Sequence, residues 1–154
     1  MTGRNPIGKL WGGASSRITE KRWLSLSTEP RWLPLSAAIE FNRQVIQKFG
    51  GTHRVRNLAA IELALASPWN LWAYSKVVDP AVLAAALFSD MASVEAFEDA
   101  NKRTAFLCAV AFIGANGSCF TMPDGEVSAR KLREFAERRL GEKALAEWLR
   151  YWIE

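Results

Sequence analysis

Residues 100–115 constrain the fold more than any other part of the chain. Their side chains are apolar on nearly every side of a helix, and the segment lies between Asp99 and the pair Asn116-Gly117. Asp is a common N-cap, Asn-Gly is a common helix end, and a helix that is hydrophobic all round is buried. We therefore expect a helix over residues 100–115, capped by Asp99, as the central buried helix of a bundle.

Five further helices are expected from caps and apolar spacing. Ser36, Asn57 and Asp79 are candidate N-caps, the last followed by a proline at the first helical position. The expected ranges are residues 36–49, 57–66, 80–92, 126–139 and 142–152. The longest alternating, strand-like run is about four residues, 118–121. These patterns predict an all-α bundle of about six helices.

The first 30 residues differ from the rest of the chain. They are rich in Gly, Ser, Thr and Arg and lack sustained periodicity, so we expect a basic, flexible extension over residues 1–30 and one domain over residues 31–154. The whole net charge of +4 lies within residues 1–35. The remaining residues are balanced in charge, which makes nucleic acid an unlikely partner.

The chain has no apolar run near the roughly 18 residues that cross a bilayer, and its N-terminus does not read as a signal peptide. These features predict a cytoplasmic protein with no membrane partner.

The chain's single histidine, His53, lies between Gly50-Gly51 and two arginines, Arg54 and Arg56. One histidine excludes a multi-histidine metal site in a monomer, and a loop histidine is usually structural, although this segment could line a nucleotide or target groove.

Residues 95–105, Glu-Ala-Phe-Glu-Asp-Ala-Asn-Lys-Arg-Thr-Ala, carry the strongest chemical signal. They place cations at the start of a buried helix, where unpaired backbone N–H groups and the helix dipole favour an anion. Ala100 leaves room for a phosphate, Lys102 and Arg103 supply positive charge, and Asp99 offers a hard oxygen ligand for Mg²⁺. The pattern predicts a phosphate site.

A structural interpretation of the same residues stays open. Asp99 would then be only a cap, and Lys102 and Arg103 only a solvated first turn. However, two cations in the first turn oppose the helix dipole and favour a compensating anion. The charge pattern therefore favours a ligand.

The segment Phe97-x-Asp99-Ala100-Asn101-Lys102-Arg103 resembles the Doc (death-on-curing) form of the Fic signature, His-x-Phe-x-Asp/Asn-Ala/Gly-Asn-Lys-Arg. The resemblance covers about residues 31–152. It includes a Gly-rich turn with a Val-Arg-Asn-Leu segment, and a final Ala-Glu-Trp-Leu helix; these lie at residues 50–51, 55–58 and 146–149. This similarity implies the compact helical fold of the Fic/Doc superfamily.

The resemblance also implies ATP and Mg²⁺ as cofactors. Asn101 would orient the nucleotide phosphates, Lys102 and Arg103 would bind them with Ala100 beside them, and Asp99 would act in catalysis by helping to hold Mg²⁺. Phe97 would anchor the motif in the core.

Proteins of this kind are toxins of toxin–antitoxin pairs, so the implied partners are a small antitoxin protein and a protein substrate. The Doc branch is known for phosphorylating a threonine of elongation factor Tu, whereas the wider family transfers AMP. Two features favour the kinase-like branch: the motif has Lys102, and the residue three positions after Arg103 is Phe106 rather than an arginine.

The departure from the signature is Glu95, at the position of the catalytic histidine that takes the proton from the target hydroxyl. A glutamate's unperturbed pKa, about 4.3, is roughly two units below that of histidine, so it is a weaker base. Glu95 could be a working base, a surface residue of an inactive protein that binds nucleotide or a partner, a partner for Arg103, or an engineered change. The sequence leaves these alternatives open.

Overall fold

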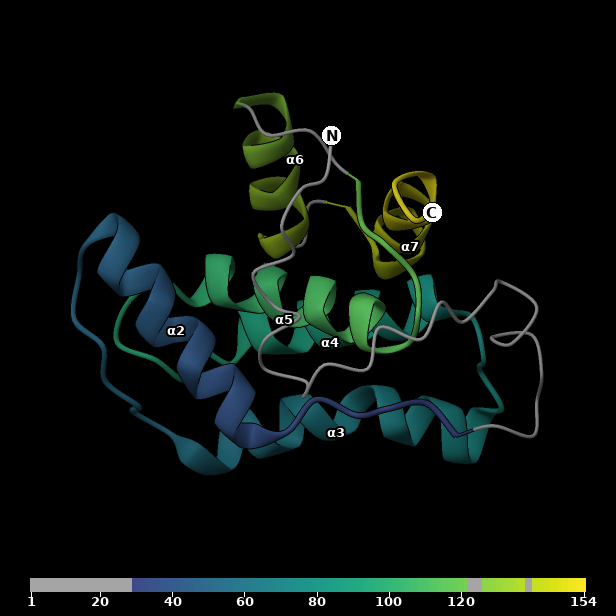
Figure 1. Ribbon diagram of the computed structural model, residues 1–154, viewed down its shortest axis with the longest axis horizontal. Helices are drawn as coiled ribbons and strands as arrows, with labels where there is room; N and C mark the ends of the chain where they lie inside the picture. The colour runs from purple at the N-terminus through teal and green to yellow at the C-terminus, as the bar shows by residue number, and fades with distance from the viewer. Residues whose placement is uncertain (1–28, 122–125, 138–139) are drawn as a thin grey trace.

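The fold is an all-α bundle, seen here in a computed structural model (Figure 1). The structure describes residues 29–121, 126–137 and 140–154, so nearly all of the expected N-terminal extension lies outside the described residues. Within this part of the chain there are six helices and no strand, as expected. They are α2 (Leu35–Phe49), α3 (Leu58–Ser75), α4 (Pro80–Ser93), α5 (Asn101–Ala115), α6 (Glu126–Ala136) and α7 (Glu142–Tyr151).

Two helix starts follow the local chemistry of their caps. The Asn57 side chain accepts a hydrogen bond from Ala60 N at 3.1 Å at the start of α3. Asp79 accepts one from Ala81 N at 2.9 Å, and Pro80 is the first residue of α4. Both N-cap predictions are confirmed, because each needs only the residues next to it.

Other helix boundaries differ from expectation, and α6 ends at Ala136 rather than at residue 139. Helix α2 begins at Leu35 with Pro34 at its N-cap, so the prediction of a Ser36 cap is wrong. The Pro34 carbonyl instead accepts hydrogen bonds from the next turn, which starts the helix without a side-chain cap. Helix α3 does not end at Ala66 but runs through Pro68 to Ser75. Pro68 is buried, so its packing offsets the hydrogen bond that a proline inside a helix removes.

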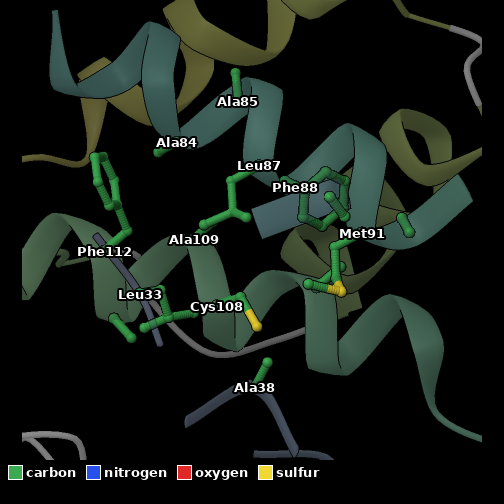
Figure 2. Packing of buried hydrophobic residues seen from close by; sticks show 14 of the residues in the cluster. Leu33, Ala38, Ala84, Ala85, Leu87, Phe88, Met91, Cys108, Ala109 and Phe112 are labelled. Carbon is green, nitrogen blue, oxygen red and sulfur yellow. The ribbon is translucent and has the colours of Figure 1, made fainter. Parts of the chain in front are cut away.

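The core lies chiefly between α4 and α5. Figure 2 shows Leu87 and Met91 reaching from α4 toward α5, where Cys108, Ala109 and Phe112 are labelled. Helix α5 is buried along its middle, as its apolar sequence predicts. Helix α4 is even more covered, with ten of its 14 residues buried, and it also packs against α3, α6 and α7. The two helices therefore share the centre of the bundle.

Both ends of the described chain are fastened near the C-terminal end of α5. Arg31 N donates to Asn116 Oδ1 at 2.7 Å, and Asn116 Nδ2 donates back to Arg31 O at 3.0 Å. Beyond α5, Cys119 and Glu154 exchange two backbone hydrogen bonds of 3.0 and 2.8 Å.

None of the helices in the described ranges has the length and apolar character that crossing a bilayer requires.

Candidate active site

Two loops meet at the N-terminal end of α5. We call residues 94–100, between α4 and α5, the motif loop, and residues 50–57, between α2 and α3, the flanking loop. Val55 and Phe97 form an antiparallel bridge, and Arg56 N donates to Ala96 O at 2.7 Å. The two loops run side by side at this end of the bundle (Figure 1).

Phe97 and Asn101 fix the shape of the motif loop. Phe97 is only 1% exposed and belongs to the hydrophobic core. Its backbone N–H donates to Asn101 Oδ1 at 2.9 Å, and Asn101 Nδ2 donates to its carbonyl at 2.8 Å. The Asn101 amide therefore holds the loop backbone, and a role toward phosphates stays a prediction.

Asp99 is not the N-cap of α5, so that prediction is wrong. Helix α5 begins at Asn101, and Ala100, at the cap position, has a left-handed backbone with φ of 62°. The Asp99 carboxylate does not cap the helix; its Oδ2 accepts a hydrogen bond from Thr52 N at 2.7 Å. The carboxylate consequently joins the motif loop to the flanking loop.

The first turn of α5 has no side-chain cap among the described residues. Its first intrahelical hydrogen bond runs from Thr104 N to Ala100 O at 3.0 Å. The backbone N–H groups before Thr104 therefore lack helix partners, and together with the helix dipole they form a setting that favours an anion. Lys102 and Arg103, both exposed, add two positive charges to the same turn.

Lys102 and Arg103 each contact a residue outside α5. Lys102 Nζ lies 3.5 Å from Glu137 Oε1 at the end of α6. The Arg103 guanidinium lies over the Phe49 ring, 3.8 Å from its centroid. In the described part of the chain there is no ion pair between Arg103 and Glu95, so the hypothesis that Glu95 neutralises Arg103 gains no support.

Glu95 is exposed and strained. Its φ is +46°, a left-handed conformation that costs a residue with a side chain about 1–3 kcal/mol. Its carboxylate has no hydrogen bond or ion pair to any of the described residues. No contact therefore orients Glu95 as a base, in contrast to the groups around it.

Gly51 lets the flanking loop approach Asp99 closely. Its φ is +110°, and an added Cβ would lie 3.1 Å from Asp99 Cβ, Asp99 Oδ2 and Ile46 Cδ1. A side chain at this position would meet both a conformational and a steric penalty. The Gly-Gly turn is thus part of the site and more than the end of α2.

Asn42 is the site residue that the sequence analysis missed. It is 0% exposed, and its Nδ2 donates to Asp99 O at 2.9 Å and to Thr104 Oγ1 at 3.0 Å. Its Oδ1 lies 2.7 Å from His53 Nδ1. An available signal was a polar residue on the apolar face of α2, beside Phe41 and Val45, because buried amides need partners.

The residues present fit Mg²⁺ with a polyphosphate rather than a metal held by the protein alone. No cluster of three or more His, Cys, Asp or Glu side chains occurs in the described ranges. Mg²⁺ is commonly held by one or two carboxylates together with substrate phosphates. Asp99 would be such a carboxylate, with its Oδ1 free of the Thr52 hydrogen bond, and the first turn of α5 would receive the phosphates.

The family model described as Fic/DOC family matches residues 32–113, which is more than half of the chain and includes both loops and most of α5. A comparison with curated proteins gave no significant match.

Proposed function

The chain belongs to the Fic/DOC family, and from this premise we propose that it is a Doc-like enzyme that transfers a phosphoryl group from ATP to a hydroxyl of a protein. One observation carries the proposal. The uncapped first turn of α5 has Lys102, Arg103 and the Asp99 carboxylate around it. An anion and its metal ion would find complementary groups at this one place.

Each residue of the site has a distinct task in this proposal. The backbone N–H groups at the start of α5 and the side chains of Lys102 and Arg103 bind the phosphates. Asp99 holds the metal ion, and Thr52 N holds Asp99. The small side chain of Ala100 leaves the helix start open. Mg²⁺ and ATP, when bound, supply the transferable phosphoryl group and neutralise its developing charge.

Phosphoryl transfer is favoured over AMP transfer by the resemblance of the motif to the Doc branch. The motif has Lys102, and the residue three positions after Arg103 is Phe106 rather than an arginine. The proposal extends to a cytoplasmic toxin–antitoxin role, with a translation factor such as elongation factor Tu as substrate and a small antitoxin as partner. These partners rest on the family resemblance.

A second candidate function is nucleotide or partner binding without transfer. The observation that favours it is the exposed carboxylate of Glu95, which has no partner among the described residues and which the resemblance aligns with the family's histidine. Losing a well-placed general base usually costs about 10²–10⁴ in rate. We therefore expect the unmodified chain to be a slow enzyme, with binding and transfer separable.

Restoring the histidine tests the proposal. We expect Glu95→His to raise transfer by about 10²-fold or more while leaving ATP affinity nearly unchanged, because only a proton acceptor is gained. The assay incubates each chain with purified elongation factor Tu or bacterial lysate, using ATP labelled at the γ- or the α-phosphate. Label from the γ-phosphate indicates phosphoryl transfer, and label from the α-phosphate indicates AMP transfer.

The matched control is Glu98→His, because Glu98 is an exposed glutamate of the same loop. It should leave transfer at the level of the unmodified chain. No transfer by either the unmodified or the Glu95→His chain, with either label, would leave only the binding function.

A further inference from the structure

His53 has a buried hydrogen-bond partner, Asn42. The residue is exposed, but its Nδ1 lies 2.7 Å from Asn42 Oδ1. Asn42 is 0% exposed, and both N–H groups of its amide are used, one by Asp99 O and one by Thr104 Oγ1. Turning the amide would break both of these hydrogen bonds, so its oxygen stays directed at His53.

This arrangement determines which ring nitrogen of His53 carries the hydrogen. An amide oxygen only accepts hydrogen bonds, so Nδ1 must donate. In the neutral ring, Nε2 then has the lone pair and is the basic atom. Enzymes orient histidine bases in the same way, with a third group bound to the nitrogen that does not react.

The flanking loop places His53 beside the motif loop. On one side of His53, Thr52 N donates to Asp99 Oδ2 at 2.7 Å. On the other side, Arg54 O accepts from Glu98 N at 2.9 Å. His53 thus lies between the two points where the flanking loop is tied to the motif loop, one of them at the proposed metal ligand.

Charged groups lie beside both neighbours of His53 on the flanking loop, because Asp99 is bonded to Thr52 N and Glu98 lies 3.8 Å from Arg54. On α2, Glu40 is close enough for the charge of His53 to affect its pKa. The Glu40 pKa is lowered to about 2 by its hydrogen bond to Arg43, and the charge of His53 adds to that lowering. Glu40 is consequently near His53 but remains paired with Arg43.

We infer that His53, positioned by Asn42, accepts the proton of the target hydroxyl in place of the histidine that the family has at position 95. The inference rests on the proposed phosphoryl transfer. The hydroxyl proton passes to Nε2 as the hydroxyl oxygen forms a bond to the γ-phosphorus of ATP. The bond from that phosphorus to the β–γ bridging oxygen breaks, and its electron pair leaves with ADP.

The first test uses the fact that the chain has one histidine. ¹⁵N NMR of the imidazole should show the Nδ1–H tautomer, and saturation with Mg²⁺ and the non-hydrolysable ATP analogue AMP-PNP should shift the Nε2 resonance. An Nε2–H tautomer, or an Nε2 resonance that does not move at saturation, would overturn the inference. Calorimetry on the same samples reports binding separately, and a failure to bind would remove the proposed function and the inference with it.

The second test separates chemistry from loop positioning. His53→Gln should lower transfer by the unmodified chain by about tenfold or more, toward the usual value of a general base. In the Glu95→His chain the same substitution should cost much less, because the family's base is back in place. Equal losses in the two chains would show that His53 only positions the flanking loop, and no loss in the unmodified chain would show that it has no part in transfer.

Discussion

The middle of helix α5 and its N-terminal end are held in place by different kinds of interaction. Its middle packs against α4 through small and apolar side chains such as Ala109 and Phe112. Its N-terminal end is held by hydrogen bonds among α2, the flanking loop and the motif loop, centred on Asn42 and Asp99. The core is stabilised by area removed from water, whereas the site depends on a few oriented polar contacts. Substitutions in the core should therefore lower stability, whereas substitutions at the N-terminal end of α5 should chiefly weaken binding.

The largest expected effect on stability is in the core. Phe88, in α4, is 1% exposed, and Phe88→Ala should lower the free energy of unfolding by about 3–5 kcal/mol, because it leaves a cavity. Urea denaturation measures this change. The control Leu63→Ala, at a side chain that is 73% exposed, should stay within about 0.5 kcal/mol of the unmodified chain. Similar losses for the two variants would contradict the division between core and surface.

The next effect concerns binding with little loss of stability. Lys102→Ala with Arg103→Ala should weaken Mg²⁺-ATP binding by about 10²-fold or more, since hydrogen bonds to charged groups contribute about 1.5–3 kcal/mol each. Calorimetry measures the affinity, and thermal melting should show a stable fold. Arg130→Ala with Lys143→Ala removes the same charge from two exposed positions elsewhere and should leave affinity near that of the unmodified chain. An affinity that survives in the first variant would rule out the proposed site.

The smallest effect tests the contact between the loops. Gly51→Ala should lower the free energy of unfolding by about 1–3 kcal/mol, because its Cβ would press on Asp99 and Ile46. Gly50→Ala is the matched control: Gly50 also has a positive φ, +88°, but no atom lies within 4 Å of its Cβ position. The difference between the two variants isolates the contact with Asp99. If both variants lose the same stability, backbone strain alone accounts for the effect.

Much of the fold could be predicted because it depends on neighbours in sequence. Asn57 and Asp79 act on N–H groups two or three residues away, so their caps were visible in the sequence. The apolar character of α5 likewise indicated burial. The extension of α3 through Pro68 could not be foreseen, because it depends on how well that proline packs against the rest of the bundle.

The site was predictable in composition but not in its connections. Lys102, Arg103 and Asp99 follow one another in one motif, and the motif indicated an anion site. The partners of Asp99 come from residues 42 and 52, far away in sequence, so its expected role as a cap was wrong. A hydrogen-bond network of this kind has no signature in a single sequence.

The hydrogen bonds of Arg31 to Asn116 and of Cys119 to Glu154 place both ends of the described chain on the side of the molecule opposite the motif loop. Both attachments lie at the C-terminal end of α5, and a helix of 15 residues separates them from the motif loop by about 22 Å. A copy tethered to a surface through its C-terminus would therefore present the motif loop away from that surface. A mechanical load pulling Arg31 and Glu154 apart would act first on those terminal hydrogen bonds, and the loops at the other end of α5 would remain unloaded until they broke.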